Sequence, residues 1–226
     1  MHDAIPQDAR GPLHGRLVAV KEVFDVAGYT CAWGTPIHRD RVPKTDAAAV
    51  HLLRDAGAII AGITVSTEYA MSRVGPTVNP WDPTRTPGAS SQGSAAAVGA
   101  GLVPLALGWQ TIGSVIRPAA YCGCVGVKPT WGMIDVAGSM PLAAPIDHVG
   151  YLASSTDLAR SALAVLAPGL DSAVRPDRVI AIQPWYEAAT NSDVTAAVAR
   201  DTGVEALILG RDDLREEWFM DSNHFN

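Results

Sequence analysis

The first sixty residues alternate short apolar runs with one amphipathic stretch. Leu17–Val20 is an apolar run that ends at Lys21, which predicts a short strand. Residues 47–56 carry apolar side chains at helical spacing, and Gly57 follows as a stop signal, so we expect a helix there. Residues 58–63 are apolar throughout and predict a second strand. Strand, helix and strand in this order indicate a parallel crossover unit and an α/β fold.

Further elements follow along the chain. Residues 91–102 have the alanine content of a helix that opens from a serine-rich turn, and residues 103–107 predict another strand. Residues 158–166 predict a short helix and residues 178–182 a further strand. Residues 79–83 contain two prolines and read as a loop.

Composition excludes several classes of protein. Of the 226 residues, 48% are hydrophobic and 18% are charged, which is not the composition of a disordered chain. The sequence has no run of 18 apolar residues and no N-terminal basic segment followed by an apolar one. We therefore expect no membrane span and no secretory signal, and a cytoplasmic location.

The charge is unevenly distributed. The net charge of −6 arises within residues 171–226, whereas acidic and basic residues balance over residues 1–170. A neutral main body makes nucleic acid an improbable partner. We predict a core of residues 1–170 and a short acidic C-terminal segment, 171–226. The odd number of cysteines, Cys31, Cys122 and Cys124, indicates buried free thiols rather than a disulfide framework or a metal site.

Lysine is scarce, with three residues against 14 arginines, and Lys21 lies where an apolar strand ends. Dry surroundings would lower the pKa of this ammonium group, because burial disfavours the charged form. A lysine that is neutral near neutral pH can act as a general base. The alternative is a lysine whose side chain extends from the strand end to water.

Two further segments can carry chemistry. Residues 87–94 form a turn rich in hydroxyl groups that opens a helix, without the Gly-Lys-Ser/Thr ending of a phosphate-binding loop. The alternative there is a capped helix start. In residues 108–119, Ser114 follows Gly113 just before a segment that contains Pro118. Successive backbone N–H groups of such a turn can form an oxyanion hole, and the alternative is an ordinary loop serine.

The order and spacing of these segments resemble the amidase signature family. The pattern Gly-x-Ser-Ser-x-Gly-Ser at residues 88–94 is followed by the Gly-Ser pair at residues 113–114, and Ser114 lies 24 positions after Ser90. The resemblance runs from about residue 11 to about residue 160 and is highly specific. It implies an α/β fold with a mixed β-sheet core flanked by helices, here shortened at both ends.

The resemblance also implies catalytic roles. Ser114 corresponds to the nucleophile, and Ser90 to a bridging serine whose peptide bond to Ala89 should be cis. Lys21 corresponds to the base that draws a proton from Ser114 through Ser90, and Ser91 supports this group. The backbone N–H groups that correspond to the oxyanion hole are those of Thr111, Ile112, Gly113 and Ser114. A serine hydroxyl is a poor nucleophile until a base takes its proton. No metal or organic cofactor is implied.

Within the family, Gln110 and residues 114–119 resemble the general amidase branch, because the amidotransferase members usually carry Asp at the position of Gln110. The expected reaction is hydrolysis of a small carboxamide, or a urea-like amide, to a carboxylate and ammonia or an amine. The acyl group would be held on Ser114. The expected partner is this small molecule, with a homo-oligomer or a complementing chain left open.

The sequence departs from the family pattern near the site. Ala89 replaces a Gly, Gln92 and Trp109 replace smaller residues, and Ile112 replaces a Gly or Ala. Ile63 stands where a Lys is common. With the short length, these departures leave two alternatives: a catalytically inactive truncated remnant, or a partner-dependent half-enzyme or binding module.

Near the C-terminus, Asp221 and His224 form an Asp-x-x-His pattern. It is faintly similar to the closing block of SGNH-type esterases, although no matching Gly-Asp-Ser block precedes it. The alternative is an irregular acidic tail.

Overall fold

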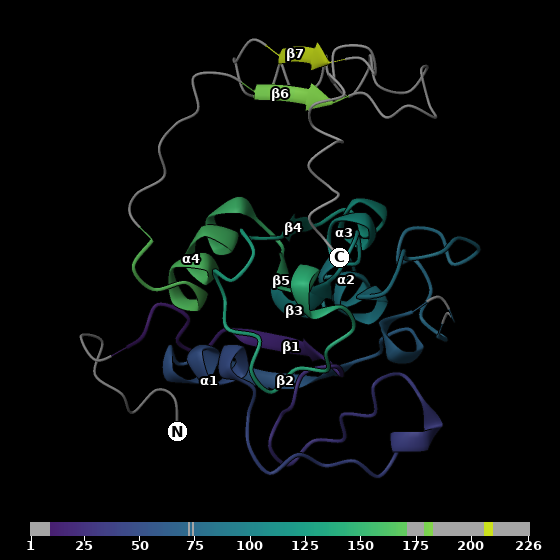
Figure 1. The fold of residues 1–226 in the computed structure, drawn as a ribbon, viewed down its shortest axis with the longest axis vertical. Coiled ribbons are helices and arrows are strands. Elements are labelled where there is room, and N and C mark those ends of the chain that lie inside the picture. Colours follow the sequence, from purple (N-terminus) through teal and green to yellow (C-terminus); the bar gives the residue numbers. More distant parts are fainter. Residues whose placement is uncertain (1–9, 72, 74, 171–178, 183–205, 210–226) are drawn as a thin grey trace. The chain divides into compact units, whose positions relative to one another are not determined.

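The computed structural model describes residues 10–71, 73, 75–170, 179–182 and 206–209 (Figure 1). The chain divides into two compact units, residues 1–170 and residues 171–226. The first unit holds a five-stranded sheet in the order β2-β1-β3-β5-β4. Its strands are β1 (Leu17–Lys21), β2 (Ile59–Thr64), β3 (Leu105–Gln110), β4 (Val125–Val127) and β5 (His148–Ala153).

The strand directions make this a mixed sheet. Strand β1 lies between β2 and β3 and runs parallel to both. Strand β5 is antiparallel to β3 and to β4. The first unit therefore has the mixed sheet and the α/β class that the sequence predicted.

Among the described residues of this unit, four α-helices flank the sheet, and short 3₁₀ turns lie at Pro36–His38, Glu68–Ala70 and Ala144–Ile146. The helices are α1 (Ala48–Asp55), α2 (Gln92–Gly99), α3 (Ile116–Cys122) and α4 (Thr156–Leu166). In Figure 1, α1 and α4 lie on one side of the sheet and α2 and α3 on the other.

The alternation of side chains along the strands produces these two layers. Val18 and Val20 of β1 belong to the hydrophobic cluster that includes buried residues of α1 and α4. Ala19, between them, belongs to the cluster that includes buried residues of α2 and α3. Strand β3 alternates in the same way, with Trp109 in the first cluster and Ala106 in the second.

The face beneath α2 and α3 contains small residues, among them Ala19, Ala106, Gly108 and Gly150, which lets these helices approach closely. A Cβ atom added to Gly108 would lie 3.0 Å from Val115 and 3.1 Å from the Ser91 hydroxyl. One added to Gly150 would lie 3.1 Å from Val115. The segments that carry the candidate serines are therefore packed directly on the sheet.

Most predicted elements are present, although they begin or end at other residues than predicted. The segments predicted at 17–20, 47–56, 58–63, 158–166 and 178–182 correspond to β1, α1, β2, α4 and β6. The predicted helix 91–102 ends earlier, at Gly99, and the strand predicted at 103–107 lies two residues further on, at Leu105–Gln110. Helix α3 and strands β4, β5 and β7 were not predicted.

In the second unit, β6 (Val179–Ile182) pairs in parallel with β7 (Ala206–Leu209). The Asp-x-x-His pattern of Asp221 and His224 lies outside the described residues. Within the described part of the chain, none of the helices has the length and apolar character needed to cross a membrane.

Candidate active site

Lys21 ends β1 on the sheet face that α2 and α3 cover, because it lies two residues beyond Ala19. Its neighbouring strands and the serine-rich turn enclose it, and its exposed fraction is 0%. The Lys21 Nζ atom donates hydrogen bonds to Ser90 Oγ at 2.7 Å and to Ser91 Oγ at 3.1 Å. The side chain thus points into the protein rather than to water.

This environment changes the acidity of the lysine. Burial lowers the pKa of Lys21 from 10.5 to about 7, and the neighbouring carboxylate of Glu22 opposes the shift by favouring the charged form. The Glu22 carboxylate is held in place, since its Oε1 atom accepts a hydrogen bond from the Ser66 N–H at 2.7 Å. Near neutral pH a substantial share of Lys21 therefore carries no proton and can accept one.

The serine-rich turn brings Ser90 and Ser91 to this lysine. The Ala89–Ser90 peptide bond is cis. The Ala89 carbonyl oxygen accepts hydrogen bonds from the Arg117 guanidinium, from Nη2 at 2.8 Å and from Nε at 3.3 Å. Ser91 Oγ accepts from the Trp109 N–H at 3.2 Å and donates to the Trp109 carbonyl at 3.3 Å. Ser91 therefore fixes the turn to β3.

Ser114 is joined to this turn by a main-chain hydrogen bond. Its carbonyl oxygen accepts a hydrogen bond from the Ser91 N–H at 3.1 Å. Its side chain is partly exposed and forms no hydrogen bond with Lys21 or Ser90, all three being described residues. The structure thus joins Lys21, Ser90 and Ser91 by direct side-chain contacts, and Ser114 by a main-chain contact. Hydrogen bonds of a catalytic serine are often loose before substrate binds.

The turn before α3 presents the N–H groups that the sequence indicated. Within the described residues, no hydrogen bond is donated by the N–H groups of Thr111, Ile112, Gly113 and Ser114. Ile112 does not adopt a positive φ, and its side chain is 88% exposed, so the branched residue is accommodated in this turn. Unused donors in one turn can stabilise a developing oxyanion.

Gln110 organises the same turn, a role that the sequence did not reveal. It ends β3 and is almost fully buried. Its Oε1 atom accepts hydrogen bonds from the N–H groups of Val115 at 2.8 Å and Ile116 at 3.0 Å, and its Nε2 atom donates to the Ile112 carbonyl at 3.1 Å. The sequence feature that could have indicated this role is a polar residue at the end of a fully buried strand.

Asp147 is a second residue that the sequence reasoning missed. Its Oδ1 atom accepts a hydrogen bond from the Thr111 hydroxyl at 2.6 Å. Its Oδ2 atom accepts from the N–H groups of Leu142 and Ala143 at 2.8 and 2.7 Å. The buried carboxylate therefore connects the 142–143 loop to the first residue of the candidate oxyanion turn.

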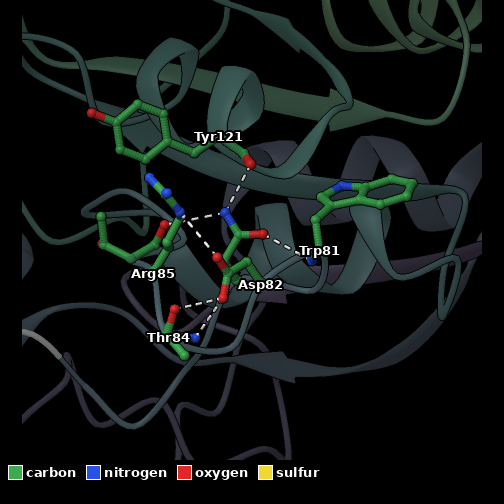
Figure 2. A network of polar contacts seen from close by, with 7 residues as sticks. Trp81, Asp82, Thr84, Arg85 and Tyr121 are labelled. Atoms are coloured by element: carbon green, nitrogen blue, oxygen red, sulfur yellow. Dashed lines mark hydrogen bonds and ion pairs between the residues drawn. The ribbon is translucent and has the colours of Figure 1, made fainter.

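A loop between residues 79 and 86 supports the far end of α3 (Figure 2). Asn79 Nδ2 donates hydrogen bonds to the carbonyls of Tyr121 at 2.9 Å and Thr86 at 3.2 Å. Trp81 Nε1 donates to the Cys122 carbonyl at 2.7 Å, although 72% of the residue is exposed. These donors satisfy the last carbonyl groups of the helix, which no helical N–H can reach.

Among the described residues, no three His, Cys, Asp or Glu side chains are grouped so as to hold a metal ion. Cys31 and Cys122 are buried free thiols, whereas Cys124 is half-buried, so it is less enclosed than the sequence predicted. Burial raises the pKa of both Cys122 and Cys124 to about 11, which keeps them protonated at neutral pH.

Comparison with known proteins identifies the family. The family model for Amidase matches residues 2–207. The chain is 41% identical over 220 residues to the A subunit of Glutamyl-tRNA(Gln) amidotransferase from Natronomonas pharaonis, covering 94% of this chain and 51% of that protein. It is 39% identical over 216 residues to the protein of the same name from Salinibacter ruber, covering 93% of this chain and 39% of that one.

Solved structures share the fold. The peptide amidase from Stenotrophomonas maltophilia superposes with a TM-score of 0.77 at 28% identity, over 89% of this chain and 49% of that one. A structure described as an unexpected vestigial protein complex that reveals the evolutionary origins of an s-triazine catabolic enzyme gives a TM-score of 0.78 at 32% identity, over 89% of this chain and 50% of that one.

The fold and the site define the class, an α/β protein with a buried lysine at the carboxyl end of an inner strand of a mixed sheet and two serines beside it. The chain belongs to the amidase family. The chain spans about half, or less, of the length of the curated relatives it matches.

Proposed function

We propose that this chain hydrolyses a small carboxamide or urea-like amide through an acyl-enzyme on Ser114. One observation carries the proposal: Lys21 Nζ is fully buried and lies 2.7 Å from Ser90 Oγ. A buried lysine next to a serine hydroxyl is an arrangement suited to moving a proton. Ser114 then has a route to a base through Ser90.

The first half-reaction begins when Lys21 is neutral. Ser90 passes its proton to Lys21 Nζ and takes the proton of the Ser114 hydroxyl, while Ser114 Oγ attacks the amide carbonyl carbon. The C–N bond then breaks, and the proton held on Lys21 returns through Ser90 to the leaving nitrogen. Ammonia or an amine departs and the acyl group stays on Ser114.

The turn before α3 supports this chemistry electrostatically. The unused N–H groups of residues 111–114 are available to the oxygen that becomes negative during attack. Fixed donors of this kind contribute about 10²- to 10³-fold each to the rate. Gln110 and Asp147 hold the turn in place, so its donors need little rearrangement when charge develops. In the second half-reaction water attacks the acyl carbon and gives a proton to the same Ser90–Lys21 pair. The bond between the acyl carbon and Ser114 Oγ then breaks, the carboxylate departs, and the proton returns through Ser90 to Ser114 Oγ.

A second candidate follows from the names of the curated relatives. Both are called subunits of an amidotransferase, and this chain spans half of one and less of the other. In this alternative the chain supplies the Lys21 and serine site, and hydrolysis requires a separate partner chain that completes the substrate pocket.

Hydrolysis of a panel of small amides tests both candidates. We expect release of ammonia or amine by the wild-type chain, and a loss of at least about 10³-fold in kcat/KM in Ser114→Ala and in Lys21→Ala. Equal activity in wild type and Ser114→Ala would contradict the proposed nucleophile. Activity that appears only when a partner chain is added would favour the second candidate.

A further inference from the structure

Arg117 connects the two segments that carry Ser90 and Ser114. It lies in the first turn of α3, three residues after Ser114. Its backbone N–H donates a hydrogen bond to the Gly113 carbonyl at 3.0 Å. Its guanidinium donates two hydrogen bonds to the Ala89 carbonyl, from Nη2 at 2.8 Å and from Nε at 3.3 Å. One residue therefore contacts the residue that precedes each of the two serines.

The guanidinium group is suited to fixing this carbonyl. Its N–H groups are held in one plane, so two donors on one oxygen define the position of that oxygen more narrowly than a single flexible donor does. A hydrogen bond from a charged donor is also roughly twice as strong as one between neutral groups. Arg117 and Ala89 are 28 residues apart in the sequence, so their contact sets the separation of the serine-rich turn and α3.

The carbonyl groups on both sides of the Ser90 backbone are held in place. The Thr67 N–H donates to the Ser90 carbonyl at 3.3 Å, and Arg117 holds the Ala89 carbonyl. Among the described residues, no other group donates to the Ala89 carbonyl. Between these two contacts, the Ser90 side chain places its Oγ atom 2.7 Å from Lys21 Nζ. Loss of the guanidinium would leave the peptide unit before Ser90 without its partner.

No carboxylate competes for this guanidinium within the part of the chain that the structure describes. Five other arginines there form ion pairs with an Asp or a Glu. The Arg117 side chain is exposed, and the hydrogen bonds that it donates to described residues both go to the Ala89 carbonyl. Its charge is therefore directed at the backbone beside Ser90 rather than used in a surface ion pair.

We propose that Arg117 is a positioning residue, which holds Ser90 at the separation from Ser114 that proton transfer requires. Arg117 acts through the Ala89 carbonyl and does not touch the reacting atoms. The inference rests on the proposed function, because Ser90 has a part in the reaction only as the group between Ser114 and Lys21. Loss of the guanidinium should therefore slow the reaction of Ser114 at every pH without weakening the binding of a reagent.

Three variants of the full chain test this role. Arg117→Met keeps a side chain of similar length and removes both donors, whereas Arg117→Lys keeps the charge and a flexible donor. Arg160→Met is the matched control, because Arg160 is an exposed residue of α4 whose side chain forms no hydrogen bond or ion pair with a described residue. The rate of fluorophosphonate labelling of Ser114 is measured against reagent concentration and pH. This separates the maximal rate constant, kinact, from the binding constant of the reagent, KI.

We expect kinact to decrease about 10- to 10²-fold in Arg117→Met, because a displacement of about 1 Å in a reacting group can cost about 10²-fold. The decrease should be smaller in Arg117→Lys and absent in Arg160→Met, and KI should be unchanged in all three. An unchanged kinact in Arg117→Met would overturn the proposal. If that variant does not fold, as judged by circular dichroism, Arg117→Lys carries the comparison, and a wild-type kinact in it would overturn the proposal.

The pH dependence distinguishes positioning from a purely electrostatic effect. If the Arg117 cation acted on Lys21 by its charge, its removal would raise the pKa of the Lys21 ammonium group and move the acid limb to higher pH. We expect the limb to stay at its wild-type pH in Arg117→Met while the plateau decreases. A loss that arises entirely from a displaced limb would overturn the proposal.

Amide hydrogen exchange followed by NMR measures the position of the turn without any reaction. The Ser91 N–H donates to the Ser114 carbonyl at 3.1 Å, so its exchange rate reports how often the turn separates from the loop that carries Ser114. We expect this exchange to be about fivefold faster in Arg117→Met, which corresponds to the loss of one hydrogen bond. The Met140 N–H, which donates to the Val23 carbonyl, should exchange at its wild-type rate. Unchanged Ser91 exchange, or equal acceleration of both amides, would overturn the proposal.

The exchange measurement also separates this proposal from the proposed function. Absence of a Ser114 adduct in the wild-type chain would contradict the hydrolase, whereas faster Ser91 exchange in Arg117→Met would still support the positioning contact. Conversely, labelling of Ser114 that depends on Lys21, together with unchanged Ser91 exchange in Arg117→Met, would support the hydrolase and contradict the role of Arg117.

Discussion

Burial, opposed by the neighbouring carboxylate of Glu22, sets the pH range in which Lys21 lacks a proton. Burial lowers the pKa of Lys21 to about 7, so the neutral form decreases as the pH falls below that value. We predict that kcat/KM decreases about tenfold per pH unit on the acid side of pH 7, because the base becomes an ammonium ion. A pH–rate profile measures this, and a flat profile down to about pH 5 would argue against Lys21 as the base.

The Glu22 carboxylate raises the pKa of Lys21, so its removal must act in the opposite direction. We predict that Glu22→Gln moves the acid limb of the profile to lower pH. The substitution retains an oxygen for the Ser66 N–H, so the loop contact can persist. A limb that stays in place, in a variant whose melting temperature is unchanged, would show that Lys21 does not produce the limb.

Gln110 gives a test of the turn that presents the oxyanion donors. Gln110→Leu leaves the N–H groups of Val115 and Ile116 without their acceptor, whereas Gln110→Glu keeps an acceptor at that position. We predict that the Leu variant is less stable by about 1–3 kcal/mol. Its kcat should decrease by a larger factor than its KM changes. The Glu variant should retain more of its stability and more of its kcat. Equal losses in the two variants, by urea titration and steady-state kinetics, would contradict this role.

At the residue scale, the motif residues were predictable and their supports were not. Lys21, Ser90, Ser91 and Ser114 lie in short patterns that carry the family resemblance. The contribution of Gln110 depends on hydrogen bonds to residues beyond its own strand, and that of Asp147 on contacts across 36 residues of sequence. The Asp147 contact forms only once the sheet has formed, so no local pattern indicates it, whereas for Gln110 the signal was a polar residue at the end of a buried strand.

At the scale of elements, the turn that carries Ser90 must pack closely against α3. Gly88 has φ +79°, and a Cβ atom there would lie 2.6 Å from Pro118 Cα. Gly101 has φ +72° and no atom within 4 Å of such a Cβ, which makes it a matched control. Replacing either glycine by Ala costs about 1–2 kcal/mol of stability, because alanine is strained in the left-handed backbone conformation.

We predict that Gly88→Ala lowers the free energy of unfolding by about 1–3 kcal/mol more than Gly101→Ala does. Of these two glycines, only Gly88 lies against the backbone of α3. It should also slow the reaction of Ser114, whose loop leads into that helix. Thermal or urea unfolding of both variants gives the comparison. Equal destabilisation would mean that the turn and α3 can separate without cost.

The elements that were missed share a physical reason. Helix α3 contains Pro118 and follows the Gly113–Ser114 pair, features that locally favour a turn. Strand β5 includes Gly150 and lies after a long irregular segment, and its antiparallel pairing with β3 depends on tertiary contacts. Elements with a simple period, such as α1 and β2, were predicted to within one residue at each end.

At the scale of the whole molecule, every candidate catalytic residue belongs to the unit of residues 1–170. We predict that a chain ending at Leu170 still unfolds cooperatively and still reacts at Ser114 with a serine-directed reagent. Circular dichroism on heating and mass spectrometry of the labelled peptide measure this. Loss of cooperative unfolding in the shorter chain would show that residues 171–226 are needed for the fold.

We propose that Lys21 activates Ser114 through Ser90 in this chain. Labelling with a fluorophosphonate, with the adduct located by peptide mass spectrometry, tests it without knowledge of the substrate. We predict an adduct on Ser114 in the wild-type chain and its loss in Lys21→Ala. A folded wild-type chain with no adduct, or an adduct that persists at the same rate in Lys21→Ala, would contradict the account.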